Sequence, residues 1–198
     1  MAIDIAEIKR LRELTGVGMT DAKSALEEAK GDFDKALEAM RKKGMTKAEK
    51  RGEREARAGI VGNYNHDNRI GVIVEVNCET DFVARNEIFT DFVKDIAMHI
   101  AAMNPQFVSA SEIPAEEQER VANEFKEKAT TEGKPADMVD KIVEGQVKKH
   151  FAERCLLDQP FIKNPDQTVD QYVKEHNARL GENVVVRRFA RIELGVGA

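Results

Sequence analysis

The sequence predicts an α+β protein, with a three-helix N-terminal bundle followed by a small antiparallel sheet packed with helices. Residues 4–44 contain three short segments with the apolar spacing of helices, separated by glycines. Residues 58–76 and 184–194 are rich in β-branched side chains, which is typical of strands. Two long amphipathic segments, at 115–132 and 136–155, lie between these runs. Helices and strands that are grouped rather than regularly alternating are typical of the α+β class.

Composition limits the classes of protein that fit. The chain has 198 residues, which is enough to bury a core without the help of disulfides. Its net charge of −5 argues against a dedicated nucleic-acid-binding protein. Cys78 and Cys155 match no metal-ligand spacing, and no apolar run reaches the length of a membrane span. We therefore expect a cytoplasmic protein with reduced thiols, no signal peptide and no membrane segment.

The N-terminal domain is predicted at residues 1–45. Its first helix places four apolar side chains on one face, and Gly16 and Gly18 permit a tight connection after it. These four side chains are Ile5, Ile8, Leu11 and Leu14.

The second and third helices of this domain have recognisable ends. Thr20 or Asp21 can cap the second helix, which is predicted at 22–30. The third helix is expected to begin at Asp32 and to end at Gly44. Three helices in so few residues form a bundle of marginal stability.

A basic linker is predicted at residues 46–57. From 41 to 57 the chain carries eight basic residues against three acidic ones, and its few apolar side chains are mostly alanine. Such a segment cannot form a core, so we expect it to be a partly helical linker. A nucleic-acid-binding patch is the alternative, but no aromatic residue is interleaved with the basic ones.

The second domain is predicted at residues 58–198 and begins with a β-hairpin. Its two strands, within 58–76, are joined by a turn at 65–68, because Asn and Asp tolerate turn geometry. His66 is expected to be exposed at the tip of this hairpin. A helix follows from Ile88, with Phe89, Phe92, Val93, Ile96 and Ile100 facing inward.

The long amphipathic segments predict an antiparallel helical hairpin, with residues 133–135 (GKP) as its turn. The second of these helices has an apolar stripe formed by Met138, Val139, Ile142, Val143, Val147 and Phe151. Residues 156–165 contain two prolines and are expected to form a loop. Thr168 can cap a helix at 169–178, and a final strand is expected at 184–194.

Residues 78–87 connect the second strand of the hairpin to the helix that follows it. Thr80 or Asp81 can cap the first free backbone N–H groups of that helix. Phe82 is unusual at such a position, because a large ring there either fills the core or projects into solvent. The pattern of residues alone is compatible with both a buried and an exposed ring.

The sequence shows no set of residues that would support an enzyme. It has no glycine loop for phosphate binding, and its serines have no nucleophile-elbow context. His99 lies in an apolar helix, where a buried structural histidine is commoner than a catalytic one, and His150 and His176 lie among charges and are expected to be solvated. We therefore expect an interaction protein rather than an enzyme.

Several short motifs resemble those of the elongation factor Ts family. Residues 11–19 (LRELTGVGM), followed by 21–23 (DAK), are similar to its N-terminal signature, and residues 75–84 (EVNCETDFVA) are similar to its second signature. Three further matches occur in the same order along the chain, at 97–102 (AMHIAA), 159–161 (QPF) and 174–177 (KEHN). The resemblance therefore covers essentially the whole chain.

The resemblance implies a guanine-nucleotide exchange factor for elongation factor Tu, the GTPase that delivers aminoacyl-tRNA. It implies that the N-terminal bundle is similar to a ubiquitin-associated domain. It also implies a set of residues that disturb the magnesium site of the GTPase, and a set that binds the partner. The first set is Thr80, Asp81, Phe82 and Val83. The second is Lys9, Met19, His66, Leu180 and Gly181.

The chain is shorter than the long form of that family. It has room for one core subdomain, and short members of the family act as homodimers, so the resemblance implies a homodimer. We expect no cofactor, no metal of its own, no small-molecule substrate, and no direct contact with nucleic acid or membrane. A non-enzymatic adaptor that binds a ubiquitin-like protein or RNA is the alternative function.

Overall fold

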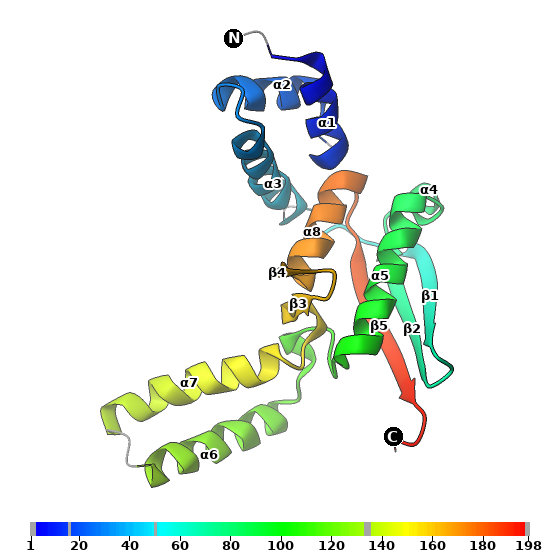
Figure 1. Ribbon diagram of the computed structural model, residues 1–198. Helices are drawn as coiled ribbons and strands as arrows, with labels where there is room; N and C mark the ends of the chain where they lie inside the picture. Colours follow the sequence, from blue (N-terminus) through cyan, green and yellow to red (C-terminus); the bar gives the residue numbers. More distant parts are fainter. Residues whose placement is uncertain (1–2, 16, 50, 133–135, 197–198) are drawn as a thin grey trace. The chain divides into compact units, whose positions relative to one another are not determined.

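The computed structural model describes residues 3–15, 17–49, 51–132 and 136–196 (Figure 1). Two compact units make up the chain, one formed by residues 1–101 and 170–198 and the other by residues 102–169. Helices and a small antiparallel sheet are both present, which confirms the α+β class. No described helix is both long enough and apolar enough to cross a membrane.

Three helices form the N-terminal bundle, as predicted: α1 (Ile5–Thr15), α2 (Met19–Glu28) and α3 (Phe33–Glu49). A small apolar core holds them together, and this arrangement fits a bundle of the ubiquitin-associated type. The core consists of Ile8, Leu11, Ala22, Ala25, Leu26, Ala36 and Met40.

Some details of the bundle differ from the prediction. Ile5 and Leu14 are exposed, because the buried stripe of α1 is centred on Ile8 and Leu11 and the two outer positions lie about 90° to either side of it. The second helix begins at Met19, so Gly18 is its N-cap and neither predicted capping side chain occupies that position. The third helix continues past Gly44 to Glu49. Gly16 lies outside the described residues.

The predicted hairpin is formed by β1 (Ala58–His66) and β2 (Ile70–Cys78). Asp67 and Asn68 have φ values of 50° and 57°, a left-handed conformation that Asp and Asn adopt more readily than most residues. The final strand, β5 (Val185–Glu193), pairs with β2 and gives a three-stranded antiparallel sheet in the order β1-β2-β5.

One face of this sheet is covered by α5 (Glu87–Met103), and all five predicted inward side chains of that helix are buried. Val72, Val74 and Val76 of β2 are buried on the same side. A short helix, α4 (Asp81–Ala84), precedes α5, and α8 (Val169–Leu180) begins directly after Thr168, as expected.

His176 on α8 was predicted to be solvated, and that prediction is wrong. Its ring lies 4.6 Å from the ring of Phe92, and its Nδ1 lies 2.9 Å from the backbone oxygen of Tyr172. The ring therefore packs against Phe92 of the neighbouring helix instead of lying free in solvent. His99 is fully buried, as expected.

In the second unit, α6 (Ala115–Thr131) and α7 (Ala136–Ala152) run side by side as a helical hairpin (Figure 1). Val139, Val143 and Phe151 of the predicted stripe are buried, whereas Met138 is exposed. The turn predicted at 133–135 lies outside the described residues.

The segment predicted as a loop at 156–165 has more structure than expected. It contains the short helix η2 (Leu156–Asp158) and the strand β3 (Pro160–Phe161), which pairs with β4 (Asn164–Thr168). Both prolines lie within this two-stranded ribbon, where short edge strands tolerate them. Another short helix, η1 (Ala110–Glu112), precedes α6.

Candidate functional site

Residues 79–84, here called the corner, connect β2 to α4. Thr80 has extended backbone angles, φ −133° and ψ 154°, and its Oγ1 accepts a hydrogen bond from the N–H of Val83 at 3.4 Å. Thr80 is therefore the N-cap of α4, which is one of the two caps predicted. Ala84 is buried and anchors the far end of the short helix.

Phe82 projects from the corner into solvent, with 92% of its surface exposed. The interpretation in which this ring fills the core is therefore wrong. Thr80 and Asp81 are also exposed, and Val83 is half-buried. The corner thus presents an aromatic ring beside a carboxylate, and the ring is not packed against the rest of the protein.

The carboxylate of Glu182 holds the corner from another part of the chain. Its Oε2 accepts the backbone N–H groups of Glu79 and Thr80, each at 3.0 Å. Its Oε1 accepts the hydroxyl of Thr80 at 2.5 Å. The end of α8 at Leu180 and the turn that follows it at Gly181 are thereby brought against the corner, so these two predicted groups of site residues lie together.

Glu79 forms the reciprocal contact. Its Oε1 accepts the backbone N–H of Asn183 at 2.7 Å, and its Oε2 lies 3.6 Å from Nη1 of Arg54. The Asn183 side-chain amide donates to the backbone oxygens of Arg54, at 2.7 Å, and Gly52, at 3.3 Å. Three segments that are distant in the sequence therefore meet at the corner.

Cys78 lies directly beneath the corner and is fully buried. Its thiol donates to the backbone oxygen of Thr80, with Sγ at 3.2 Å from that oxygen. Burial, together with the negative charge of Glu182, raises the pKa of Cys78 to about 11. The thiol is therefore protonated and structural at neutral pH.

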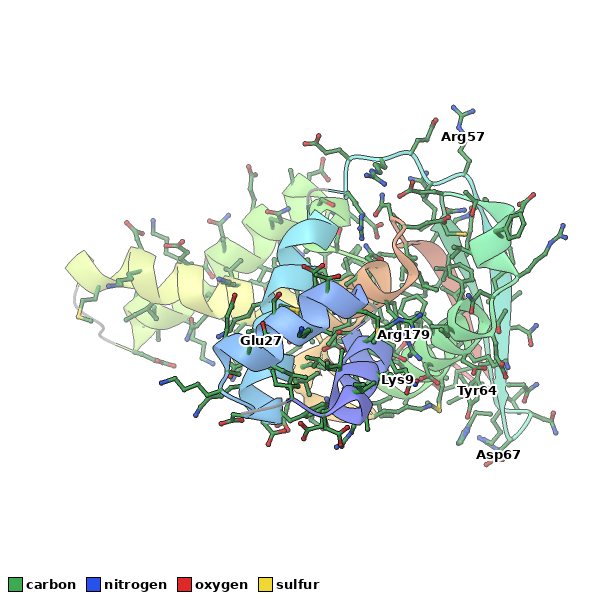
Figure 2. The ribbon with its side chains drawn as sticks, turned by 90° about the horizontal axis from the view of Figure 1, so that it is seen from above. Lys9, Glu27, Arg57, Tyr64, Asp67 and Arg179 are labelled. Atoms are coloured by element: carbon green, nitrogen blue, oxygen red, sulfur yellow. The ribbon has the colours of Figure 1, made fainter. Side chains whose placement is uncertain are left out.

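The remaining predicted partner-binding residues lie elsewhere. Lys9 on α1 and Met19 at the start of α2 are both exposed on the bundle. His66 is exposed at the hairpin tip, where its ring stacks on that of Tyr64 at 6.1 Å. Figure 2 shows Tyr64 and Asp67 at the tip end of β1 and Arg57 at the opposite end of that strand. The corner follows the last residue of β2, which pairs with Ala58, so it lies at the Arg57 end.

Prediction from sequence missed Glu79, Glu182 and Asn183 as parts of the site. The first lies inside the motif at 75–84, but nothing in the pattern separates a structural carboxylate from a solvated one. Glu182 and Asn183 contact the corner across more than 100 residues of sequence, and spacing alone cannot reveal such a contact.

The chemistry of the corner is that of a binding surface. Among the described residues, no group of three or more His, Cys, Asp and Glu side chains could hold a metal ion. The carboxylates that lie in the corner network accept backbone N–H groups, which leaves them fixed in place. The exposed ring and the adjacent Asp81 are suited to contact another macromolecule.

Comparison with known proteins identifies the family. The model of the family described as elongation factor Ts matches residues 5–196. The chain belongs to the elongation factor Ts family.

Relatives that carry this family's name match along all or nearly all of the chain. Elongation factor Ts of Geobacter sulfurreducens is 52% identical over 198 residues, which cover 100% of this chain and 92% of the relative. Elongation factor Ts of Acetivibrio thermocellus is 52% identical over 191 residues, covering 96% of this chain and 89% of the relative. That of Alkaliphilus metalliredigens is 51% identical over 197 residues. Membership of this family makes the chain a translation elongation factor with a nucleotide-exchange role associated with elongation factor Tu.

Proposed function

We propose that this protein accelerates the release of GDP from elongation factor Tu by inserting the corner beside the Mg²⁺ and phosphate site of the GTPase. The observation that carries the proposal is the exposure of Phe82 on a hydrogen-bonded corner. A phenylalanine that is 92% exposed contributes little to its own fold, so its burial is available to a complex.

An exchange factor of this kind needs no catalytic group. A GTPase holds GDP through its phosphate contacts and through the Mg²⁺ that neutralises them. The exchange factor has to bind the open, nucleotide-free GTPase better than the closed one, and nucleotide must weaken the binding of the factor by the same amount. Burying a phenylalanine is worth about 1.5–3 kcal/mol, which corresponds to a shift of roughly ten- to a hundredfold if that burial occurs only in the open state.

Asp81 is the polar partner of Phe82 in this proposal. Its exposed carboxylate would lie near a metal ion and a phosphate, where it can compete for hydrogen-bond donors or repel the phosphate. Lys9, Met19, His66, Leu180 and Gly181 are proposed to bind other parts of the same GTPase.

The direct test is the release of fluorescently labelled GDP from elongation factor Tu of the same organism. We expect the rate to rise with the concentration of this protein and to saturate. Binding to a ubiquitin-type protein, or salt-sensitive binding to RNA, with no effect on GDP release would instead favour the adaptor function.

We also propose that the protein is a homodimer, and that the open face of the sheet contributes to its interface. The pairing register places Val61, Ile73 and Ile192 on this face, and they are 65%, 55% and 73% exposed. Apolar side chains in neighbouring strands form a patch of the kind that protein interfaces use. Sedimentation equilibrium tests this proposal: Ile73→Asp should yield monomers, and a wild-type protein that sediments as a monomer would contradict it.

A further inference from the structure

We infer that Glu182 is a positioning residue for exchange: its carboxylate fixes the backbone of the corner and so holds the ring of Phe82 ready for the partner. The inference rests on the proposed function, because it concerns how the same corner is presented. Glu182 reaches the corner from the turn after α8, 102 residues away from Thr80 in the sequence.

The first step is the number of donors that one side chain satisfies. Glu182 accepts two consecutive backbone N–H groups, at 3.0 Å each, and the Thr80 hydroxyl at 2.5 Å. That hydroxyl in turn accepts the N–H of Val83. A single carboxylate therefore orders the entry to α4 and, through Thr80, its first turn.

The second step is that α4 cannot order itself. It has four residues. A helix of one turn loses the conformational entropy of nucleation but is too short to gain the further hydrogen bonds that stabilise a longer helix. Phe82 cannot provide the order either, because its side chain is 92% exposed. The direction of the ring is therefore set by the backbone of the corner, which Thr80 and Glu182 hold at its start and buried Ala84 anchors at its end.

The third step is that Glu182 is itself held in place. Asn183, the next residue, donates its backbone N–H to Glu79 and its side-chain amide to Arg54. The N–H of Val184 donates to Oδ1 of Asn177 on α8 at 3.0 Å. Gly181 has a φ of 77°, which lets the chain reverse immediately before Glu182. The turn is therefore held by Asn177 and Arg54 as well as by Glu79 of the corner, and it supports the corner through Glu182.

Three substitutions of Glu182 separate the role of geometry from that of charge. Glu182→Gln keeps the length: its oxygen can accept both N–H groups, and its NH₂ can donate to the Thr80 hydroxyl oxygen. Glu182→Asp keeps the charge but is one methylene too short to make the same contacts. Glu182→Ala removes both. Glu112→Ala is the matched control, because Glu112 also accepts a backbone N–H, that of Val108 at 2.8 Å, in the other unit.

The experiment measures labelled-GDP release from elongation factor Tu and, by NMR, the hydrogen exchange of the Glu79 and Thr80 amides. In Glu182→Ala and Glu182→Asp we expect the stimulation to fall roughly tenfold, because an unordered corner must be ordered on contact with the partner. Exchange of the two corner amides should accelerate, while that of Val74 in the sheet should stay as in the wild type. Glu182→Gln and Glu112→Ala should stimulate release as the wild type does.

Two results would overturn the inference alone. Glu182→Ala could stimulate release as well as the Glu112→Ala control does, or Glu182→Asp could be active while Glu182→Gln is not, which would show that charge acts instead of position. A wild-type protein that fails to accelerate GDP release would overturn the proposed function, and this inference with it.

Discussion

Phe82 differs from the other phenylalanines near it in the chain. Phe89 and Phe92 are buried to 1% exposure or less, whereas Phe82 is almost fully exposed. Exposing an aromatic ring forgoes the burial free energy that would stabilise the fold. Phe82 lies in solvent on a backbone that a distant carboxylate holds. These are the properties expected of a binding residue.

The thiol of Cys78 should be inert in the folded protein. Its burial and the nearby Glu182 carboxylate raise its pKa to about 11, and burial also raises the pKa of Cys155. Because the thiolate is the reactive form, we expect a thiol-reactive dye at pH 7 to label neither cysteine until the protein is unfolded. Rapid labelling of the native protein, measured by mass spectrometry, would contradict the buried position of both thiols.

His176 should make stability depend on pH. Burial, and to a smaller extent Arg179, lower its pKa from the usual 6.5, so the unfolded chain binds a proton at a higher pH than the folded one. Its contribution is present above pH 6.5 and is lost as the pH falls through the lowered pKa. We expect the free energy of unfolding by urea to decrease from about pH 6.5 downward. The decrease should be smaller in His176→Gln, and equal slopes in the two proteins would show that another group is responsible.

Single residues of the site could be predicted only where the motif names them. The start of a helix at the corner, capped by Thr80 or Asp81, follows from the sequence, because a strand followed by a capping residue defines a helix start. The direction of Phe82 and the role of Glu182 could not be predicted, because both depend on contacts between segments far apart in the chain. The burial of His176 was missed for the same reason: its neighbours Phe92 and Tyr172 lie on two different helices.

At the scale of elements, the packing of α5 on β1 requires a glycine. A Cβ atom on Gly62 would lie 2.3 Å from Cγ1 of Val93. We expect Gly62→Ala to destabilise the fold by about 1–3 kcal/mol, as other overpacked cores are destabilised. Chemical denaturation measures this change, with Gly71→Ala as the control, because a Cβ there would meet no atom within 4 Å. Equal stability of the two variants would mean that α5 shifts freely over the sheet.

Elements with strong periodicity were the most predictable. The hairpin, α5, α6 and the last strand match the prediction within a few residues, because alternation and helical spacing are local signals. The segment at 156–165 could not be predicted in this way. Its strands have two and five residues, too short for a pattern, and their pairing depends on the turn between them.

At the scale of the whole molecule, the corner and the hairpin tip lie at opposite ends of a nine-residue strand. Such a strand spans about 30 Å, so the two sites should contact different parts of a partner. We expect the losses in binding free energy to elongation factor Tu from His66→Ala and Phe82→Ala to add in the double variant. Strong non-additivity in calorimetric titrations would show that both residues act on one surface.

The most direct test of the account compares wild-type protein with Phe82→Ala in the release of labelled GDP from elongation factor Tu. We expect the variant to lose roughly ten- to a hundredfold of the stimulation. Because the ring is exposed, its melting temperature should stay close to that of the wild type. A variant that melts normally and still releases GDP as fast as the wild type would contradict the central claim.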